Sequence, residues 1–168
     1  MASIIVYFSR RGENYVSGTL KELTIGNTEV AAGVIRELTR ADTFSIEPVQ
    51  PYSKRYNDCI AQAQADQRRD ARPELKRYPE SLDGYDTVYL GYPIWWGIAA
   101  WPVNSFVKGN DFTGKTVIPF CTSASSPLAG SGEKLAAMTT TGDWKSGQRF
   151  SSGASQSTVK TWVDGLEF

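Results

Sequence analysis

The chain has 168 residues, with 18 lysines and arginines balanced by 18 aspartates and glutamates and no histidine. This length predicts one domain spanning residues 1–168, and the 40% hydrophobic content is typical of a globular protein rather than a disordered one. The net charge of zero argues against binding to nucleic acid and against polybasic contacts with a membrane surface. The lack of histidine excludes imidazole bases and imidazole metal sites, and we expect no bound metal.

Strand and helix patterns alternate along the chain. Residues 3–8 form an apolar run typical of a strand buried on both faces, and a helix with one apolar stripe follows from residue 26. Further strands are predicted at 43–46, 87–92, 116–121 and, more weakly, 148–151, and further helices at 53–69, 101–108, 133–138 and 159–166. Pro119 weakens the prediction for strand 116–121 because it cannot donate a ladder hydrogen bond. The alternation predicts an α/β, doubly wound fold with an open parallel sheet.

Two segments bear on the cellular location. The apolar N-terminal run is about seven residues long and lacks a basic region and a cleavage site, so it predicts a strand rather than a signal peptide. Residues 87–107 carry no charge, but glycines and prolines interrupt them, and we expect no membrane span. The two cysteines, Cys59 and Cys121, are too few for a disulfide framework. We therefore expect a cytoplasmic protein.

The segment after the first strand is a candidate phosphate site. In a doubly wound sheet a ligand binds outside the carboxyl ends of the strands, where the strand order reverses. The segment holds Ser9, Arg11, Asn14 and Tyr15, and the following helix begins at residues 27–28. Hydroxyl and amide groups beside a helix N-terminus suit an anion. The alternative is that residues 27–28 only cap their helix.

The segments after the third and fourth strands point to the same edge of the sheet. Residues 92–97 place two adjacent tryptophans between a proline and a glycine. Their faces suit stacking on a flat heteroaromatic ring, although a hydrophobic lid or a dimer patch is an alternative. Residues 122–126 are small, and all but Ala124 carry a hydroxyl donor, so they either approach a ligand or form a plain serine-rich connection. Convergence of all three segments favours a ligand site.

A second phosphate-binding pattern lies elsewhere in the chain. Residues 109–116 match GxxxxGK[ST], the pattern of a phosphate-binding loop. Such a loop follows a strand and opens a helix, whereas this segment follows a predicted helix and opens a strand. We therefore expect no phosphate site there.

Five collinear segments resemble the flavodoxin family, in particular its bacterial flavodoxin-like branch: VYFSRRGENY, IGNTEVAA, residues 52–73, GYDTVYLGYPIWWG and DFTGKTVIPFCTS. The resemblance implies a five-stranded parallel sheet in the order 2-1-3-4-5, with non-covalently bound FMN at its carboxyl edge. It also implies the residues that bind the cofactor. These are Ser9, Arg11, Asn27 and Thr28 on the phosphate, with Asn14 and Tyr15 nearby, Pro93, Ile94, Trp95, Trp96 and Gly97 along the isoalloxazine, and Thr122 and Ser123 on its other side.

Three features depart from the family pattern. About a dozen residues, 13–25, separate the first loop from its helix, whereas short flavodoxins pass directly into the helix. The chain is neutral, whereas carrier flavodoxins are usually strongly acidic, which steers them to basic redox partners. No aromatic residue lies between Thr122 and Met138, so this loop cannot stack a second ring on the flavin. One flavin face is then available to a substrate.

Three functions are consistent with these patterns. The first is electron transfer between bound FMN and a redox partner protein, because flavin chemistry needs no histidine, metal or protein nucleophile. The second is an FMN-dependent reductase that takes hydride from NAD(P)H and reduces quinones or similar acceptors. The third is a non-catalytic interaction module, in which Trp95, Trp96 and Trp101 form an exposed patch and no flavin binds.

Overall fold

The computed structural model describes residues 2–16, 19–23, 26–69, 73–79, 81–95, 98–123, 128, 130–151 and 156–166. Its strands are β1 (Ser3–Tyr7), β2 (Gly12–Val16), β3 (Thr19–Leu23), β4 (Asp42–Ser45), β5 (Thr87–Trp95), β6 (Ile98–Ala99), β7 (Thr116–Ser123), β8 (Asp143–Trp144) and β9 (Gln148–Ser151). Its helices are α1 (Asn27–Thr39), α2 (Tyr56–Arg68), α3 (Trp101–Lys108), α4 (Ser131–Thr139) and α5 (Gln156–Asp164).

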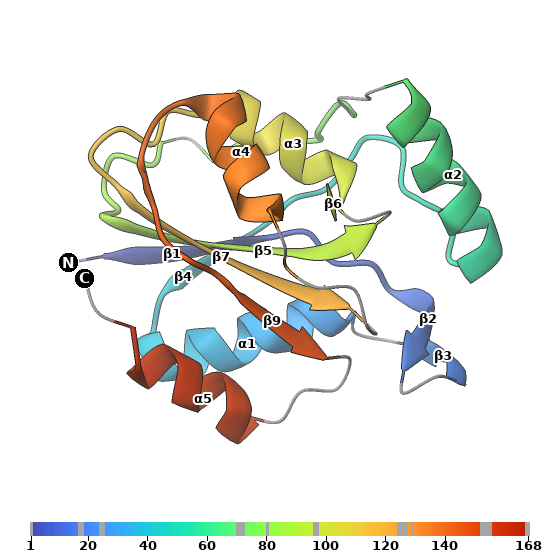
Figure 1. Ribbon diagram of the computed structural model, residues 1–168, viewed down its shortest axis with the longest axis horizontal. Coiled ribbons are helices and arrows are strands. Elements are labelled where there is room, and N and C mark those ends of the chain that lie inside the picture. Colours follow the sequence, from blue (N-terminus) through green and yellow to red (C-terminus); the bar gives the residue numbers. More distant parts are fainter. Residues whose placement is uncertain are drawn as a thin grey trace.

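The central sheet is parallel and runs in the order β4-β1-β5-β7, and the next position is shared by β8 and β9 (Figure 1). β8 pairs with the start of β7 and β9 with its end, so Pro119 lies between the two paired stretches. Counted along the chain, the order is 2-1-3-4-5. The doubly wound α/β fold and its strand order are therefore confirmed, including a fourth strand that accommodates a proline.

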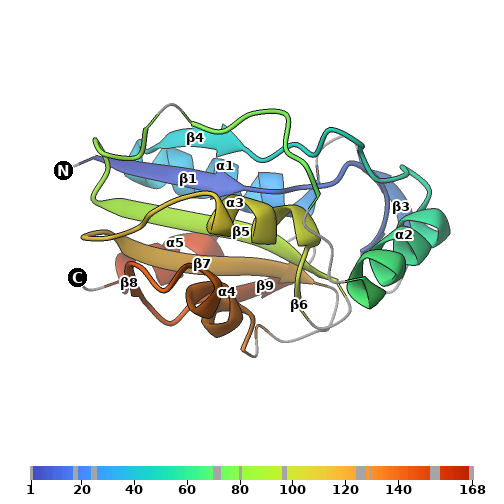
Figure 2. The ribbon, with the colours of Figure 1, turned by 90° about the horizontal axis from the view of Figure 1, so that it is seen from above.

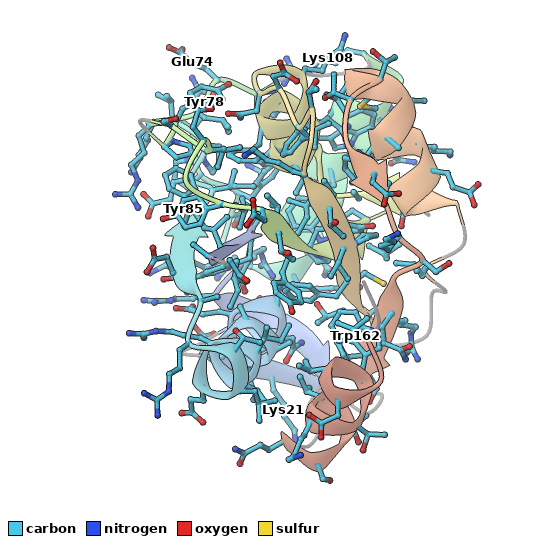
Figure 3. The ribbon with its side chains drawn as sticks, turned by 90° about the vertical axis from the view of Figure 1, so that its left-hand side faces the viewer. Lys21, Glu74, Tyr78, Tyr85, Lys108 and Trp162 are labelled. Atoms are coloured by element: carbon cyan, nitrogen blue, oxygen red, sulfur yellow. The ribbon has the colours of Figure 1, made fainter. Side chains whose placement is uncertain are left out.

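Helices cover both faces of the sheet. Figures 1 and 2 show α1 and α5 on one face and α3 and α4 on the other, with α2 beyond the carboxyl ends of the strands. In Figure 3, Tyr78 and Lys108 mark the α3 side and Trp162 the α5 side. Successive residues of a strand face opposite sides, so Ile4 and Val6 belong to the core under α3 and α4, and Ile5 belongs to the core under α1 and α5.

A β-hairpin stands between the first strand and its helix. β2 and β3 pair antiparallel from Gly12 with Leu23 to Val16 with Thr19. The expectation of a loop is therefore wrong from residue 12 onward. The two residues between the strands are Ser17 and Gly18, which lie outside the described residues.

Backbone contacts hold this hairpin against the segment before α2. The Glu13 N–H donates to the Lys54 carbonyl at 2.7 Å, and a Glu13 carboxylate oxygen accepts from the Tyr56 N–H at 3.0 Å. Gly12 has φ +103°, and a Cβ there would lie 2.6 Å from the Lys54 carbonyl oxygen, so only glycine fits. These contacts place the start of α2 beside the hairpin, beyond the carboxyl edge of the sheet (Figure 1).

The third strand is longer than expected. β5 continues to Trp95 and pairs antiparallel with β6, Ile94 with Ala99 and Trp95 with Ile98. The strand predicted at residues 87–92 is therefore confirmed, but the expectation of a loop directly after it is wrong for residues 93–95. Trp96 and Gly97, which connect β5 to β6, lie outside the described residues.

The segment with the second phosphate-binding pattern is a connection at the amino edge of the sheet. It follows α3 and opens β7, as expected. Gly114 adopts φ +79°, and the Lys115 ammonium donates to the carbonyls of Leu82 and Tyr85 at 2.6 and 2.7 Å. Lys115 is buried, so its ammonium group donates to these backbone carbonyls rather than binding a phosphate.

Gly91, in the middle of β5, offers a test of core packing. A Cβ there would lie 2.2 Å from Cζ of Phe120, a fully buried ring packed against Phe150 and Trp162. Because that ring has no free space, Gly91→Ala is expected to cost about 2–3 kcal/mol of unfolding free energy, measured by urea denaturation. Gly84→Ala is the control, since its Cβ meets nothing within 4 Å. Equal midpoints for the two variants would contradict this account.

Candidate functional site

The turn that follows β1 packs closely against the first turn of α1. A Cβ on Gly26, the N-cap residue of α1, would lie 2.2 Å from Ser9 Oγ and 2.6 Å from the Arg10 carbonyl oxygen. Ser9 Oγ accepts a hydrogen bond from the Glu29 N–H at 3.1 Å. The N–H groups of Gly26, Asn27 and Thr28 have no acceptor within a helix that starts here. This turn can therefore offer backbone donors and a helix dipole to an anion.

Buried hydroxyls join this turn to the end of β7. Thr28 Oγ1 lies 2.7 Å from Thr122 Oγ1, and both side chains are buried. The segments after the first and fourth strands therefore meet at the carboxyl edge, as the sequence predicts. The adjacent residue, Ser123, accepts hydrogen bonds from Arg149 on β9, through its Oγ at 2.8 Å and its carbonyl at 2.9 Å. Sequence reasoning missed Arg149, because an arginine in a weakly predicted strand carries no signal of its own.

Trp95 lies in an aromatic cluster at the same edge. Its ring is half-buried and makes edge-to-face contacts with Phe8, with centroids 5.5 Å apart, and with Tyr52, with centroids 4.8 Å apart. Trp95 also packs against the core beneath α3. The tryptophan is thus held in place by the core while it stays partly exposed where β5 ends.

Tyr52, which sequence reasoning also missed, contacts a charged pair at the C-terminal end of α2. Its hydroxyl donates to the carboxylate of Asp66, which is 6% exposed and also accepts from Arg69 Nη2 at 2.7 Å. Burial, followed by the hydrogen bond to Asp66, raises the pKa of Tyr52 well above its ordinary value. Tyr52 therefore remains a neutral donor, and α2 fixes the orientation of its ring against Trp95.

Arg11 lies beside the α1 turn but contacts a carboxylate. Its Nη2 is 3.2 Å from Glu29 Oε2, and its Nε donates to Oε1 at 3.3 Å. The Arg11 side chain is 62% exposed, so solvent screens this pair and it adds little to stability. The charge of Arg11 is consequently available at the turn, and its contact with a phosphate stays a prediction.

The remaining predicted residues fall into three groups. Pro93 and Ile94 are half-buried on β5 next to Trp95, and Asn27 is half-buried on the first turn of α1. Asn14 and Tyr15 pair with Lys21 and Leu20 in the hairpin, and their side chains are outside the described part of the structure. Trp96 and Gly97 are also outside it. The idea of an exposed patch that includes Trp101 is wrong, because this residue is only 4% exposed.

Within the part of the chain that the structure describes, no group of three histidine, cysteine, aspartate or glutamate side chains is arranged to hold a metal ion. None of the helices in these residues has the length and apolar character needed to cross a membrane.

Comparisons with known proteins agree with the fold. A family model described as flavodoxin matches residues 21–166. A protein from Bacteroides uniformis assigned as a flavoprotein is 31% identical, with 97% of each chain covered and a TM-score of 0.78. One from Bacteroides eggerthii with the same assignment is 28% identical, with 97% of this chain and 96% of that chain covered and a TM-score of 0.78.

A flavoprotein from Lactobacillus acidophilus, solved in complex with FMN, shares the fold at 16% identity, with 96% of this chain and 98% of that chain covered and a TM-score of 0.67. No curated protein matches the chain. The family model covers more than half of the sequence, and the protein from Bacteroides uniformis exceeds 30% identity over nearly all of it. The chain therefore belongs to the flavodoxin family.

Proposed function

We propose that this protein binds FMN non-covalently at the carboxyl edge of the sheet and transfers electrons through it. The observation that carries the proposal is the junction between α1 and β7. There Gly26 leaves no room for a side chain, and Ser9 Oγ accepts a hydrogen bond from the Glu29 N–H. Thr28 Oγ1 lies 2.7 Å from Thr122 Oγ1. A glycine at a helix N-terminus beside hydroxyl groups is suited to a phosphate monoester.

The groups at this edge fit the parts of FMN. The α1 turn, with Ser9, Asn27 and the nearby Arg11, would hold the phosphate, and Trp95 with Pro93 would lie along the isoalloxazine. The small residues at the end of β7 allow the other side of the ring to approach the backbone. Bound FMN would supply one- and two-electron chemistry, while these residues bind it, orient it and exclude water from it.

Two electron-transfer roles are consistent with this site. A carrier would exchange electrons with a redox partner protein. A cytoplasmic location agrees with two cysteines, Cys59 and Cys121, that are free thiols.

A reductase of quinone-type acceptors that uses NAD(P)H is the second candidate, and one observation favours it. A pocket of about 880 Å³ borders Tyr52, the ring that contacts Trp95, and is lined further by Val49, Gln50, Pro51, Gln62, Ala65, Asp66, Arg69, Pro73 and Glu74.

The first experiment is a titration of purified, flavin-free protein with FMN, followed by absorption and tryptophan fluorescence. We expect flavin bands shifted from those of free FMN, quenched tryptophan emission and binding at least about tenfold tighter than that of riboflavin, which lacks the phosphate. Protein that binds neither flavin would overturn the proposal.

The second measurement separates the two electron-transfer roles. The FMN-loaded protein is mixed with NADH or NADPH and a soluble quinone, with free FMN as the control. Rapid oxidation of the nicotinamide by the protein alone identifies a reductase. Oxidation no faster than that by free FMN identifies a carrier that needs a partner protein.

A further inference from the structure

Arg149 is held in one fixed position at the carboxyl edge of the sheet. It lies on β9, where it pairs in register with Cys121 of β7. Its Nε donates to Ser123 Oγ at 2.8 Å and its Nη2 to the Ser123 carbonyl at 2.9 Å. Two parallel hydrogen bonds to one residue fix the plane of the guanidinium, because its donors form a rigid fork.

Within the described residues, the charge of Arg149 has no carboxylate as a counter-ion. Among the described residues, no carboxylate lies within ion-pair distance of it, although the side chain is half-buried. The nearest titratable group on β7, Cys121, does not supply one. Burial raises the pKa of Cys121 to about 12, although the charge of Arg149 acts in the opposite direction, so the thiol stays neutral. A half-buried, fixed guanidinium of this kind attracts an anionic group of a ligand that binds beside it.

A short chain of contacts connects Arg149 to the proposed cofactor site. Arg149 donates a hydrogen bond to Ser123, which follows Thr122 in the chain. The Thr122 hydroxyl is hydrogen-bonded to that of Thr28, which lies on the first turn of α1. Figure 1 shows β9 and β7 ending at the same edge of the sheet. The guanidinium therefore lies at the end of β7, whose small residues the proposed function places beside the flavin ring.

We propose that Arg149 is the positive group that favours the reduced flavin over the oxidised one at this site. The inference rests on the proposed function. Two electrons and one proton convert oxidised flavin to its reduced monoanion, and the negative charge lies at the pyrimidine end of the ring. A fixed cation near that end stabilises the anion selectively and raises the midpoint potential. Arg149 thus sets the midpoint potential of the bound flavin, and so how readily the protein accepts electrons. The composition and the fold alone do not determine that potential.

The test is a redox titration of FMN-loaded protein with dithionite as the reductant, together with FMN affinity in the oxidised state. Arg149→Gln removes the charge, and Arg149→Met is a second uncharged variant if the first does not fold. We expect oxidised FMN to bind within about threefold of wild type and reduced FMN about tenfold more weakly. By the two-electron relation, that tenfold change lowers the midpoint potential by about 30 mV.

Two control variants separate charge from mechanical support. Arg149→Lys keeps the charge, so we expect its midpoint potential to stay close to that of the wild type. Its affinity for reduced FMN relative to oxidised FMN should change by less than about threefold. Lys145→Gln removes an exposed charge that pairs with Asp143 at the start of the fifth strand position, and it should leave the potential unchanged.

The outcomes distinguish this inference from the proposed function. Equal weakening of oxidised and reduced FMN by Arg149→Gln would mean that Arg149 meets the phosphate or only supports Ser123, and it would overturn the inference alone. An unchanged potential in the uncharged variants would do the same. Wild-type protein that binds neither form of FMN would overturn both.

Discussion

Gly26→Ala is expected to abolish tight FMN binding while the rest of the fold persists. The new Cβ would lie 2.6 Å from the Arg10 carbonyl and 2.2 Å from Ser9 Oγ, so the segment after β1 has to move away from α1. That movement breaks the hydrogen bond between Ser9 and the Glu29 N–H and removes the close approach that forms the anion turn. We expect FMN affinity to fall by at least about tenfold and the unfolding free energy by about 1–3 kcal/mol.

Gly33→Ala is the matched control for this variant, because it makes the same change in the same helix. Gly33 is exposed on α1, and a Cβ there meets nothing within 4 Å. Alanine in a helix interior is expected to stabilise the protein by about 0.5–1 kcal/mol and to leave FMN affinity unchanged. Isothermal titration and urea denaturation measure both quantities. If Gly26→Ala binds FMN as tightly as Gly33→Ala does, the anion turn is not the phosphate site.

The sheet could be predicted because its strands carry a strong hydrophobic signal. Residues 3–8 and 87–92 are nearly continuous apolar runs, and both form strands buried between two helical layers. The strand order followed from the family resemblance, and the sequence alone established only the alternation of strands and helices. Even the weakest prediction, a strand near residue 148, matches β9.

The hairpin of β2 and β3 was missed because its signal is local and polar. Its strands contain Glu13, Asn14, Lys21 and Glu22, and apolar alternation is too short to mark them. What fixes the hairpin is contact with residues far along the chain, such as the bond between Glu13 and Lys54. Such long-range contacts are not encoded in any window of neighbouring residues.

The candidate site was predicted as a set of residues, and the contacts among them came only from the structure. The Thr28 hydroxyl lies against that of Thr122 and joins two segments, and Arg11 pairs with Glu29. The phosphate roles expected for Thr28 and Arg11 stay predictions. Tyr52 and Arg149 were missed because their importance comes from the residues they touch, Trp95 and Ser123, which lie 43 and 26 positions away.

Trp95→Ala is expected to change the redox behaviour of bound FMN more than any other substitution on β5. An indole packed against the flavin excludes water and disfavours the negatively charged reduced ring, which lowers the second one-electron potential. Removing it should raise that potential, by about 59 mV for each tenfold gain in relative affinity for the reduced form. The variant also loses the contacts with Phe8 and Tyr52, at a cost of about 2 kcal/mol, since the side chain is only half-buried.

Trp144→Ala separates the redox effect from the loss of stability. Trp144 is also half-buried, packs edge-on against Phe112 with centroids 6.0 Å apart, and donates from Nε1 to the Thr141 carbonyl at 2.8 Å. It lies on β8, beside the start of β7, whereas the proposed cofactor site lies at the end of β7. We therefore expect Trp144→Ala to lower the urea midpoint about as much as Trp95→Ala does, while the redox potentials of bound FMN stay unchanged. Bound FMN should still quench the fluorescence of the remaining tryptophans fully. Potentials that stay unchanged in Trp95→Ala as well would show that this indole does not meet the flavin, because the same stability loss would then occur at both positions without any effect on the ring.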